Sequence, residues 1–78
     1  MRKLIPLHLL PIGQKGQVKQ LTAEGKTRRR MLDLGLTYDT KVEALRKSPS
    51  GDPVAYEFRG TVLALRAEEA CQIMVEIG

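Results

Sequence analysis

The sequence has few of the residues that small domains use for covalent or metal cross-links. Its 78 residues include one cysteine, one histidine and no tryptophan. A lone cysteine, Cys71, excludes an internal disulfide, and its apolar neighbours favour a buried structural thiol. His8 is the only histidine, and the sequence has no Cys-x-x-Cys or His-x-x-x-His spacing. The usual four-ligand zinc site is therefore excluded. The adjacent acids Glu68 and Glu69 would diverge by about 100° on a helix, which favours two solvated charges. We therefore predict no cofactor and no metal site.

Aromatic residues and long apolar runs are also scarce. Tyr38, Tyr56 and Phe58 are the only aromatics, so few side chains could stack on the bases of a single-stranded nucleic acid. The most apolar stretch, residues 4–11, contains two prolines and a histidine. It is far shorter than the roughly 20 residues that span a bilayer, and no small-residue cleavage site follows it. Together with the lone thiol, these features predict a cytoplasmic protein without direct membrane insertion.

Positive charge is concentrated in the first half of the chain. Residues 1–40 contain eight Lys/Arg and three acids, whereas residues 41–78 contain five Lys/Arg and six acids. The first half therefore presents a positive surface that favours an anionic partner, without identifying that partner.

The apolar pattern predicts a small barrel. With 78 residues the chain has room for one core, so we predict a single domain over residues 1–78. Apolar residues alternate with the period of a strand, and Ser48–Pro53 and Gly60-Thr61 are typical of hairpin turns. We expect strands at 17–22, 41–47, 54–59, 61–66 and 73–77, one helix, and a helical turn at 67–71. Short strands with tight connections favour closure, because an open sheet would expose pairing edges. The expected inward residues are Val18, Leu21, Leu32, Val42, Ala44, Val54, Tyr56, Phe58, Leu63, Leu65, Ile73 and Val75.

The stretch Gly25–Gly35, GKTRRRMLDLG, begins like a phosphate-binding loop. Such a loop needs Gly-x-x-x-x-Gly-Lys-Ser/Thr, so that backbone N–H groups surround the phosphates. The position of the first glycine is occupied by Gln20, and the preceding strand is polar. We therefore predict no nucleotide site and no enzymatic activity.

The same stretch is better explained as a capped helix. Thr27 can cap the N-terminus through its hydroxyl. Gly35 can close the helix in the left-handed conformation, with Leu36 just beyond it contacting Met31. Successive residues of an α-helix are rotated by roughly 100°, so the side chains fall on two faces. The apolar face contains Met31, Leu32 and Leu34, and the opposite face contains Arg29, Arg30 and Asp33.

The three consecutive arginines allow two interpretations. Asp33 can pair with Arg29 or Arg30 for about 0.2–0.5 kcal/mol, which would make this a solvated face. Alternatively, the arginines form a contact surface, since arginine is enriched at interface hot spots and binds carboxylates or phosphates through two parallel bonds. The sequence leaves both interpretations open.

The order of motifs resembles the FeoA family of bacterial ferrous-iron uptake over nearly the whole chain. The opening Leu7, Leu10, Gly13, Gly16 and Val18 is similar to that family's L-x-x-L-x-x-G-x-x-G-x-V. Residues 30–36 resemble its R-L-x-x-L-G helix, residues 49–53 its P-x-G-D-P hairpin, and residues 65–70 its L-R-x-x-E-A turn. Each motif is weak alone, but four in the same order at the same spacing are specific.

The resemblance implies an SH3-like barrel of about five strands with one inserted helix and a short C-terminal helical turn. It also implies an accessory of FeoB, the membrane Fe(II) transporter that carries a cytoplasmic GTP-binding domain. The sequence departs from the family pattern in the connection after the helix, where Thr37-Tyr38-Asp39-Thr40 replaces the usual Thr-Pro-Gly. Asp39 is expected to tolerate the positive φ of that turn.

We therefore expect a non-enzymatic, regulatory binding module that docks on FeoB and modulates its activity. The candidate partner-binding residues are Arg29, Arg30, Tyr38, Pro49, Gly51 and Asp52. The alternative is a small basic nucleic-acid-binding barrel, whose affinity would have to persist at physiological salt. A metal-sensing module is a third option. Self-association is left open.

Overall fold

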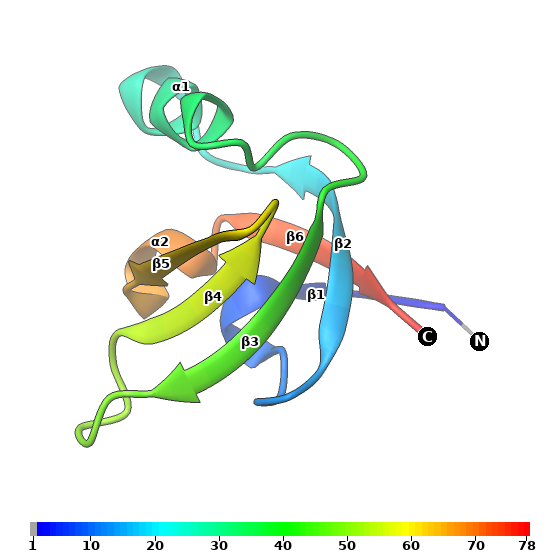
Figure 1. The fold of residues 1–78 in the computed structure, drawn as a ribbon. Coiled ribbons are helices and arrows are strands. Elements are labelled where there is room, and N and C mark those ends of the chain that lie inside the picture. Colours follow the sequence, from blue (N-terminus) through cyan, green and yellow to red (C-terminus); the bar gives the residue numbers. More distant parts are fainter. Residues whose placement is uncertain (1) are drawn as a thin grey trace.

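The computed structural model describes residues 2–78, which form a six-stranded antiparallel sheet with two α-helices and a 3-10 turn (Figure 1). The elements are β1 (Lys3–Pro6), η1 (Leu7–Leu9), β2 (Lys15–Leu21), α1 (Gly25–Asp33), β3 (Lys41–Lys47), β4 (Val54–Phe58), β5 (Thr61–Leu65), α2 (Ala67–Ala70) and β6 (Ile73–Ile77). The strand order is β1-β6-β2-β3-β4-β5. The prediction of a mainly β barrel with one inserted helix and a C-terminal helical turn is confirmed. None of the helices within residues 2–78 has the length and apolar character needed to cross a lipid bilayer.

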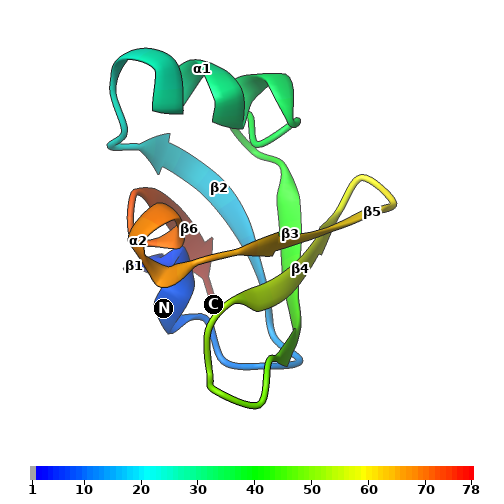
Figure 2. The ribbon, with the colours of Figure 1, turned by 90° about the vertical axis from the view of Figure 1, so that its left-hand side faces the viewer.

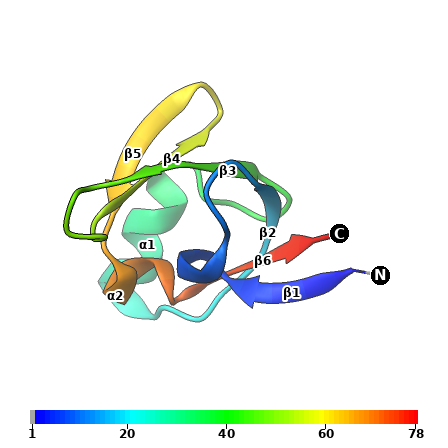
Figure 3. The ribbon, with the colours of Figure 1, turned by 90° about the horizontal axis from the view of Figure 1, so that it is seen from below.

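The sheet contains a strand that the sequence pattern did not reveal. β1 pairs with β6 through the register Lys3↔Ile77 to Pro6↔Met74, so the two ends of the described chain lie on neighbouring strands (Figure 3). Pro6 weakens the strand signal, and β1 is too short to show a clear alternation. The strand stands at an end of the sheet order, where a proline without an N–H is tolerated.

The core lies inside the curved sheet and follows the alternating pattern. The buried apolar residues are Leu7, Leu10, Val18, Ala23, Met31, Leu36, Val42, Ala44, Tyr56, Phe58, Leu65, Ala70, Ile73 and Val75. Leu21, Val54 and Leu63, which were predicted to be inward, are partly buried against this cluster. Leu32 was predicted incorrectly, since 38% of it is exposed. Within the helix α1, only Met31 is buried.

The turn η1 fills the end of the barrel opposite α1. Seen from below, it lies inside the ring of strands (Figure 3). Its Leu7 is fully buried, and the Tyr56 hydroxyl donates a 3.4 Å hydrogen bond to the Leu7 carbonyl. The same carbonyl accepts a 3.0 Å hydrogen bond from the Leu10 N–H. The barrel is thus closed at one end by η1 and covered at the other by α1.

The buried Tyr56 makes stability sensitive to high pH. Burial, reinforced by the negative charge of Asp52, raises the pKa of Tyr56 above its ordinary value of 10.0. Above that pH the unfolded chain loses the phenolic proton while the folded chain retains it. The folded state then binds more protons, so this contribution to stability falls as the pH rises.

We expect the variant Tyr56→Phe to lose this part of the pH dependence. At neutral pH the substitution should cost less than about 1.5 kcal/mol, since the Leu7 carbonyl keeps its second donor. Urea denaturation of both proteins between about pH 8 and 11 measures the effect. The wild type should lose stability more steeply above the ordinary tyrosine pKa of roughly 10, at which the unfolded chain begins to lose the proton. Parallel curves would contradict the assignment.

Candidate docking surface

The helix α1 begins earlier than the sequence predicted. Its first residue is Gly25, which has a φ of 58°, and the N-cap Glu24 makes no side-chain capping hydrogen bond. Thr27 therefore lies inside the first turn, and its prediction as the cap was wrong. The chain already turns at Gly25, two residues after the buried Ala23, so the helix starts two positions before that threonine. Arg28 ties the helix back to β2, because its Nη1 donates a 3.0 Å hydrogen bond to the Leu21 carbonyl.

The end of α1 follows the predicted geometry. Gly35 has a φ of 102°, the left-handed conformation. Its N–H donates to the Leu32 carbonyl, and the Leu36 N–H donates to the Met31 carbonyl, both at 3.0 Å. This pair of bonds is the Schellman motif. The buried Leu36 then anchors the end of the helix in the core.

The outer side of α1 carries a shallow groove beside Arg29. Gly25, Arg28, Arg29, Leu32 and Asp33 line this open groove of about 400 Å³. Arg29 is exposed, and no ion pair involves it within residues 2–78. Its guanidinium is therefore available to a partner. Lys26, which a phosphate-binding loop would use, does not line this groove.

Arg30 forms an ion pair with a different element. Its Nη1 lies 2.8 Å from Oε2 of Glu69 in α2. The predicted local pair with Asp33 is thus not the one that Arg30 makes. Since the Arg30 side chain is 60% exposed, the pair contributes at most about 1 kcal/mol. It orients α1 relative to α2.

The connection between α1 and β3 presents Tyr38. Tyr38 is 68% exposed, and Nζ of Lys19 lies 4.9 Å from the centroid of its ring. Lys19 also donates a hydrogen bond to Asp39, which raises the pKa of Lys19. Asp39 has the expected positive φ, at 68°, and its N–H donates a 2.7 Å bond to the Val18 carbonyl. Tyr38 is therefore held outward from a well-bonded turn.

Arg59 is a candidate that the sequence analysis missed. It occupies the two-residue turn between β4 and β5, with a φ of 53°. Its Nη2 donates a 3.3 Å hydrogen bond to Oγ1 of Thr37, so this turn meets the Tyr38 loop. A two-residue turn containing Gly60 between two apolar strands was the available signal. The signal located the turn, but not what it touches.

The predicted site residues fall into two separate regions. Arg29, Arg30 and Tyr38 lie at the α1 end, whereas Pro49, Gly51 and Asp52 lie in the β3–β4 turn at the opposite end (Figure 2). The Asp52 carboxylate accepts a 2.8 Å hydrogen bond from the Ala67 N–H at the start of α2, and its other oxygen lies 3.8 Å from Arg66. These contacts give Asp52 a structural role.

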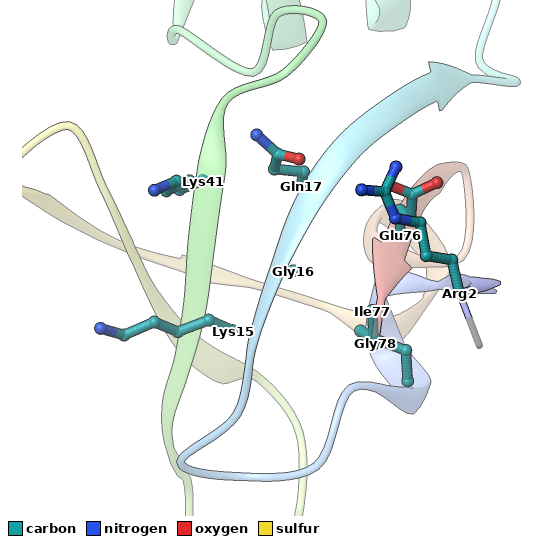
Figure 4. A pocket seen from close by; sticks show the side chains of 8 residues that line it. All are labelled: Arg2, Lys15, Gly16, Gln17, Lys41, Glu76, Ile77 and Gly78. Carbon is teal, nitrogen blue, oxygen red and sulfur yellow. The ribbon is translucent and has the colours of Figure 1, made fainter.

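A larger open groove lies on the outer face of the sheet. It measures about 480 Å³ and is bordered by β2, β3, β6 and Arg2 (Figure 4). Arg2 lies 3.7 Å from Glu76, while Lys15 and Lys41 extend toward the other side. The lining cations do not converge on one point. This groove therefore provides no defined anion site.

Metal-ligating residues do not gather in the described part of the chain. Within residues 2–78, no three His, Cys, Asp or Glu side chains lie together as a metal site would require. Cys71 was predicted to be buried, but it is exposed, with its thiol donating to the Glu68 carbonyl at 3.3 Å. The neighbouring Ala70 and Ile73 take the inward positions and leave Cys71 outside.

The comparison with known proteins decides the family. A sequence model of the FeoA domain matches residues 5–77. This chain belongs to the FeoA family. None of the curated proteins compared with it matches.

Solved FeoA structures share the fold of this FeoA-family chain. FeoA from Chlorobium tepidum is 38% identical, with a TM-score of 0.87 over 94% of this chain and 70% of that one. A FeoA-like protein from Clostridium acetobutylicum is 39% identical, with a TM-score of 0.86 over 96% of this chain and 87% of that one.

The description of a third similar structure names the type of barrel. It is a zinc complex of FeoA from Stenotrophomonas maltophilia, 29% identical, with a TM-score of 0.79 over 88% of this chain and 86% of that one. It is described as a procaryotic SH3 domain protein and proposed there as a ferrous iron transport activating factor. The SH3-like assignment of the present chain is thereby confirmed.

Proposed function

We propose that this chain is a non-enzymatic accessory protein of bacterial ferrous iron uptake, which binds the cytoplasmic part of a FeoB-type Fe(II) transporter and modulates its activity. Membership of the FeoA family supports the iron-uptake role. The proposal includes a cytoplasmic location, where the transporter's GTP-binding domain would be within reach.

The observation that carries the docking proposal is the composition of the α1 end. Arg29, Tyr38 and Arg59 are all exposed there, on segments held by the Schellman end of α1 and by hydrogen bonds to the barrel. Arginine and tyrosine dominate interface hot spots. Because their supporting backbone is already ordered, binding would not have to order these segments.

Binding alone would not modulate a transporter. A bound accessory changes an equilibrium only if it has different affinities for two states of its partner. We infer that the α1 end meets a part of the transporter that differs between its functional states. Three cations of the basic first half already form ion pairs within the chain: Arg2 with Glu76, Lys19 with Asp39 and Arg30 with Glu69. This pairing reduces the positive charge available to a nucleic acid and supports the protein-binding role.

The test is a charge reversal at Arg29. We expect Arg29→Glu to raise the Kd for the detergent-solubilised transporter at least about tenfold, a loss of roughly 1.4 kcal/mol. The variant Lys3→Glu makes the same change in net charge on β1, far from α1, and should stay within about threefold of wild type. Equilibrium binding at about 0.15 M salt, where distant charges are screened, measures both. Equal weakening by the two variants would remove the α1 end from the interface, and no binding by the wild type would refute the proposed function.

A further inference from the structure

The strand β5 has a free edge. It stands last in the sheet order and pairs only with β4, through Phe58↔Thr61 to Val54↔Leu65. The two-residue turn makes Phe58 and Thr61 a hydrogen-bonded pair, so alternate residues of β5 bond to β4. Val62 and Ala64 must then direct their N–H and C=O groups away from β4. Within residues 2–78, neither takes part in a backbone hydrogen bond outside the strand ladder.

The sequence of β5 does not protect this edge. Exposed edge strands are commonly blunted by lysine, proline or a bulge. Here the strand is Thr-Val-Leu-Ala-Leu, without a charge or a proline, and its pairing with β4 is regular throughout. Val62 is 50% exposed. The edge therefore offers unpaired backbone groups flanked by a small apolar surface.

Arginines stand at both ends of the free edge. Arg59 lies in the turn before β5, separated from the strand by Gly60, and Arg66 immediately follows the strand. Each keeps donors available, since Arg59 has one 3.3 Å bond to Thr37 and Arg66 lies 3.8 Å from Asp52, near the limit of an ion pair. A strand added along β5 would thus have a guanidinium near each end.

The charges at the two ends distinguish between occupants. If two copies of this chain paired antiparallel through β5, Arg59 of each copy would approach Arg66 of the other. A parallel pair would bring each arginine toward its own equivalent. Like charges opposite one another destabilise strand pairing, so a second copy is disfavoured at both ends. A segment with carboxylates near its ends would instead form two charge-assisted contacts.

We propose that β5 is the docking edge for an extended acidic segment of the partner protein, which adds to the sheet as a further strand. Main-chain hydrogen bonds to Val62 and Ala64 supply the affinity, as in other cases of strand addition. The segment has an uncharged centre of five residues, matching β5, with an acid near each end. This inference rests on the proposed function, because the partner is the transporter, and Arg59 belongs to both surfaces.

The decisive measurement uses the wild-type chain. Amide hydrogen exchange is followed by NMR for the chain alone and for the chain with the full-length transporter in detergent. We expect the Val62 and Ala64 amides to exchange at least about tenfold more slowly in the complex, since each gains a hydrogen bond. The Leu63 and Leu65 amides already bond to β4 and should change less.

Matched variants test the same edge through the Kd. Val62→Pro removes an outward N–H without removing a bond to β4, a position where edge strands tolerate proline. We expect it to weaken transporter binding at least tenfold, roughly 1.4 kcal/mol. Val62→Thr keeps the N–H and the β-branched shape and should stay within about threefold. Arg66→Gln, which removes one end charge, should weaken binding about threefold or more.

The outcomes separate the inference from the function on which it rests. Transporter binding with unchanged Val62 and Ala64 exchange would overturn strand addition and leave the docking function intact. Absence of binding would refute both. Slowed exchange that depends on the concentration of the chain alone would assign the edge to a second copy. Wild-type affinity for Arg66→Gln beside a weakened Val62→Pro would overturn the acidic character of the segment.

Discussion

The variant Leu36→Ala is expected to lower the free energy of unfolding by about 2–5 kcal/mol. Leu36 is fully buried, and it follows the left-handed Gly35 that ends α1. Its truncation would leave a cavity where the helix joins the core. A domain of this size has a total stability of roughly 5 kcal/mol or little more, so a substantial unfolded population should appear. Urea denaturation followed by circular dichroism measures the loss.

The matched control is Leu34→Ala, two residues earlier in the same segment. Leu34 is 38% exposed, and we expect its truncation to cost less than about 1 kcal/mol. Both substitutions remove the same atoms, and both positions lie after the last residue of α1, Asp33. Equal losses at the two positions would mean that Leu36 does not anchor the helix.

The variant Gly16→Val is expected to destabilise the chain by about 1–3 kcal/mol through overpacking. A Cβ at Gly16 would meet the Glu76 carbonyl oxygen and the Val75 Cβ, each at 3.2 Å. Gly16 does not have a positive φ. The family motif places a glycine here, and the structure explains it by the close approach of β2 to β6. The loss should grow from Gly16→Ala to Gly16→Val in thermal or urea denaturation.

Gly13 provides the contrasting control. It has a φ of 88°, and a Cβ there would meet nothing within 4 Å. Substitution should therefore cost backbone strain that depends on residue type rather than on size. Gly13→Asn, although larger, should be less destabilising than Gly13→Ala, because asparagine tolerates the left-handed region better. A size-dependent loss at Gly13 would contradict this distinction between the two glycines.

The strands could largely be predicted because their information is local. Alternation of apolar residues located β2 through β6, and β3 and β6 have the predicted bounds. β1 could not be found in this way, since its four residues are too few to show a clear alternation and include Pro6. Leu32 illustrates another limit. Periodicity identifies the apolar side of a helix, but it does not tell how much of that side a neighbour covers.

The contacts of the candidate site could not be predicted from local spacing, because they join residues that are distant in the sequence. Local spacing suggested that Arg30 pairs with Asp33, whereas its partner is Glu69, brought close by the fold. Asp52 likewise accepts from Ala67 across the β4–β5 hairpin. The Tyr38 loop was recognised as a departure from the family pattern, but its contact with Arg59 needed the folded chain. The proposed partner contacts remain predictions.

The single buried side chain of α1 has an evolutionary consequence. Folding constrains Met31 and the Gly35-Leu36 stop, whereas the other helix positions contribute little to the core. Selection at those positions should therefore reflect what the helix meets rather than how the barrel folds. Divergent relatives can change their binding preference by replacing residues on one surface helix, with little change in melting temperature.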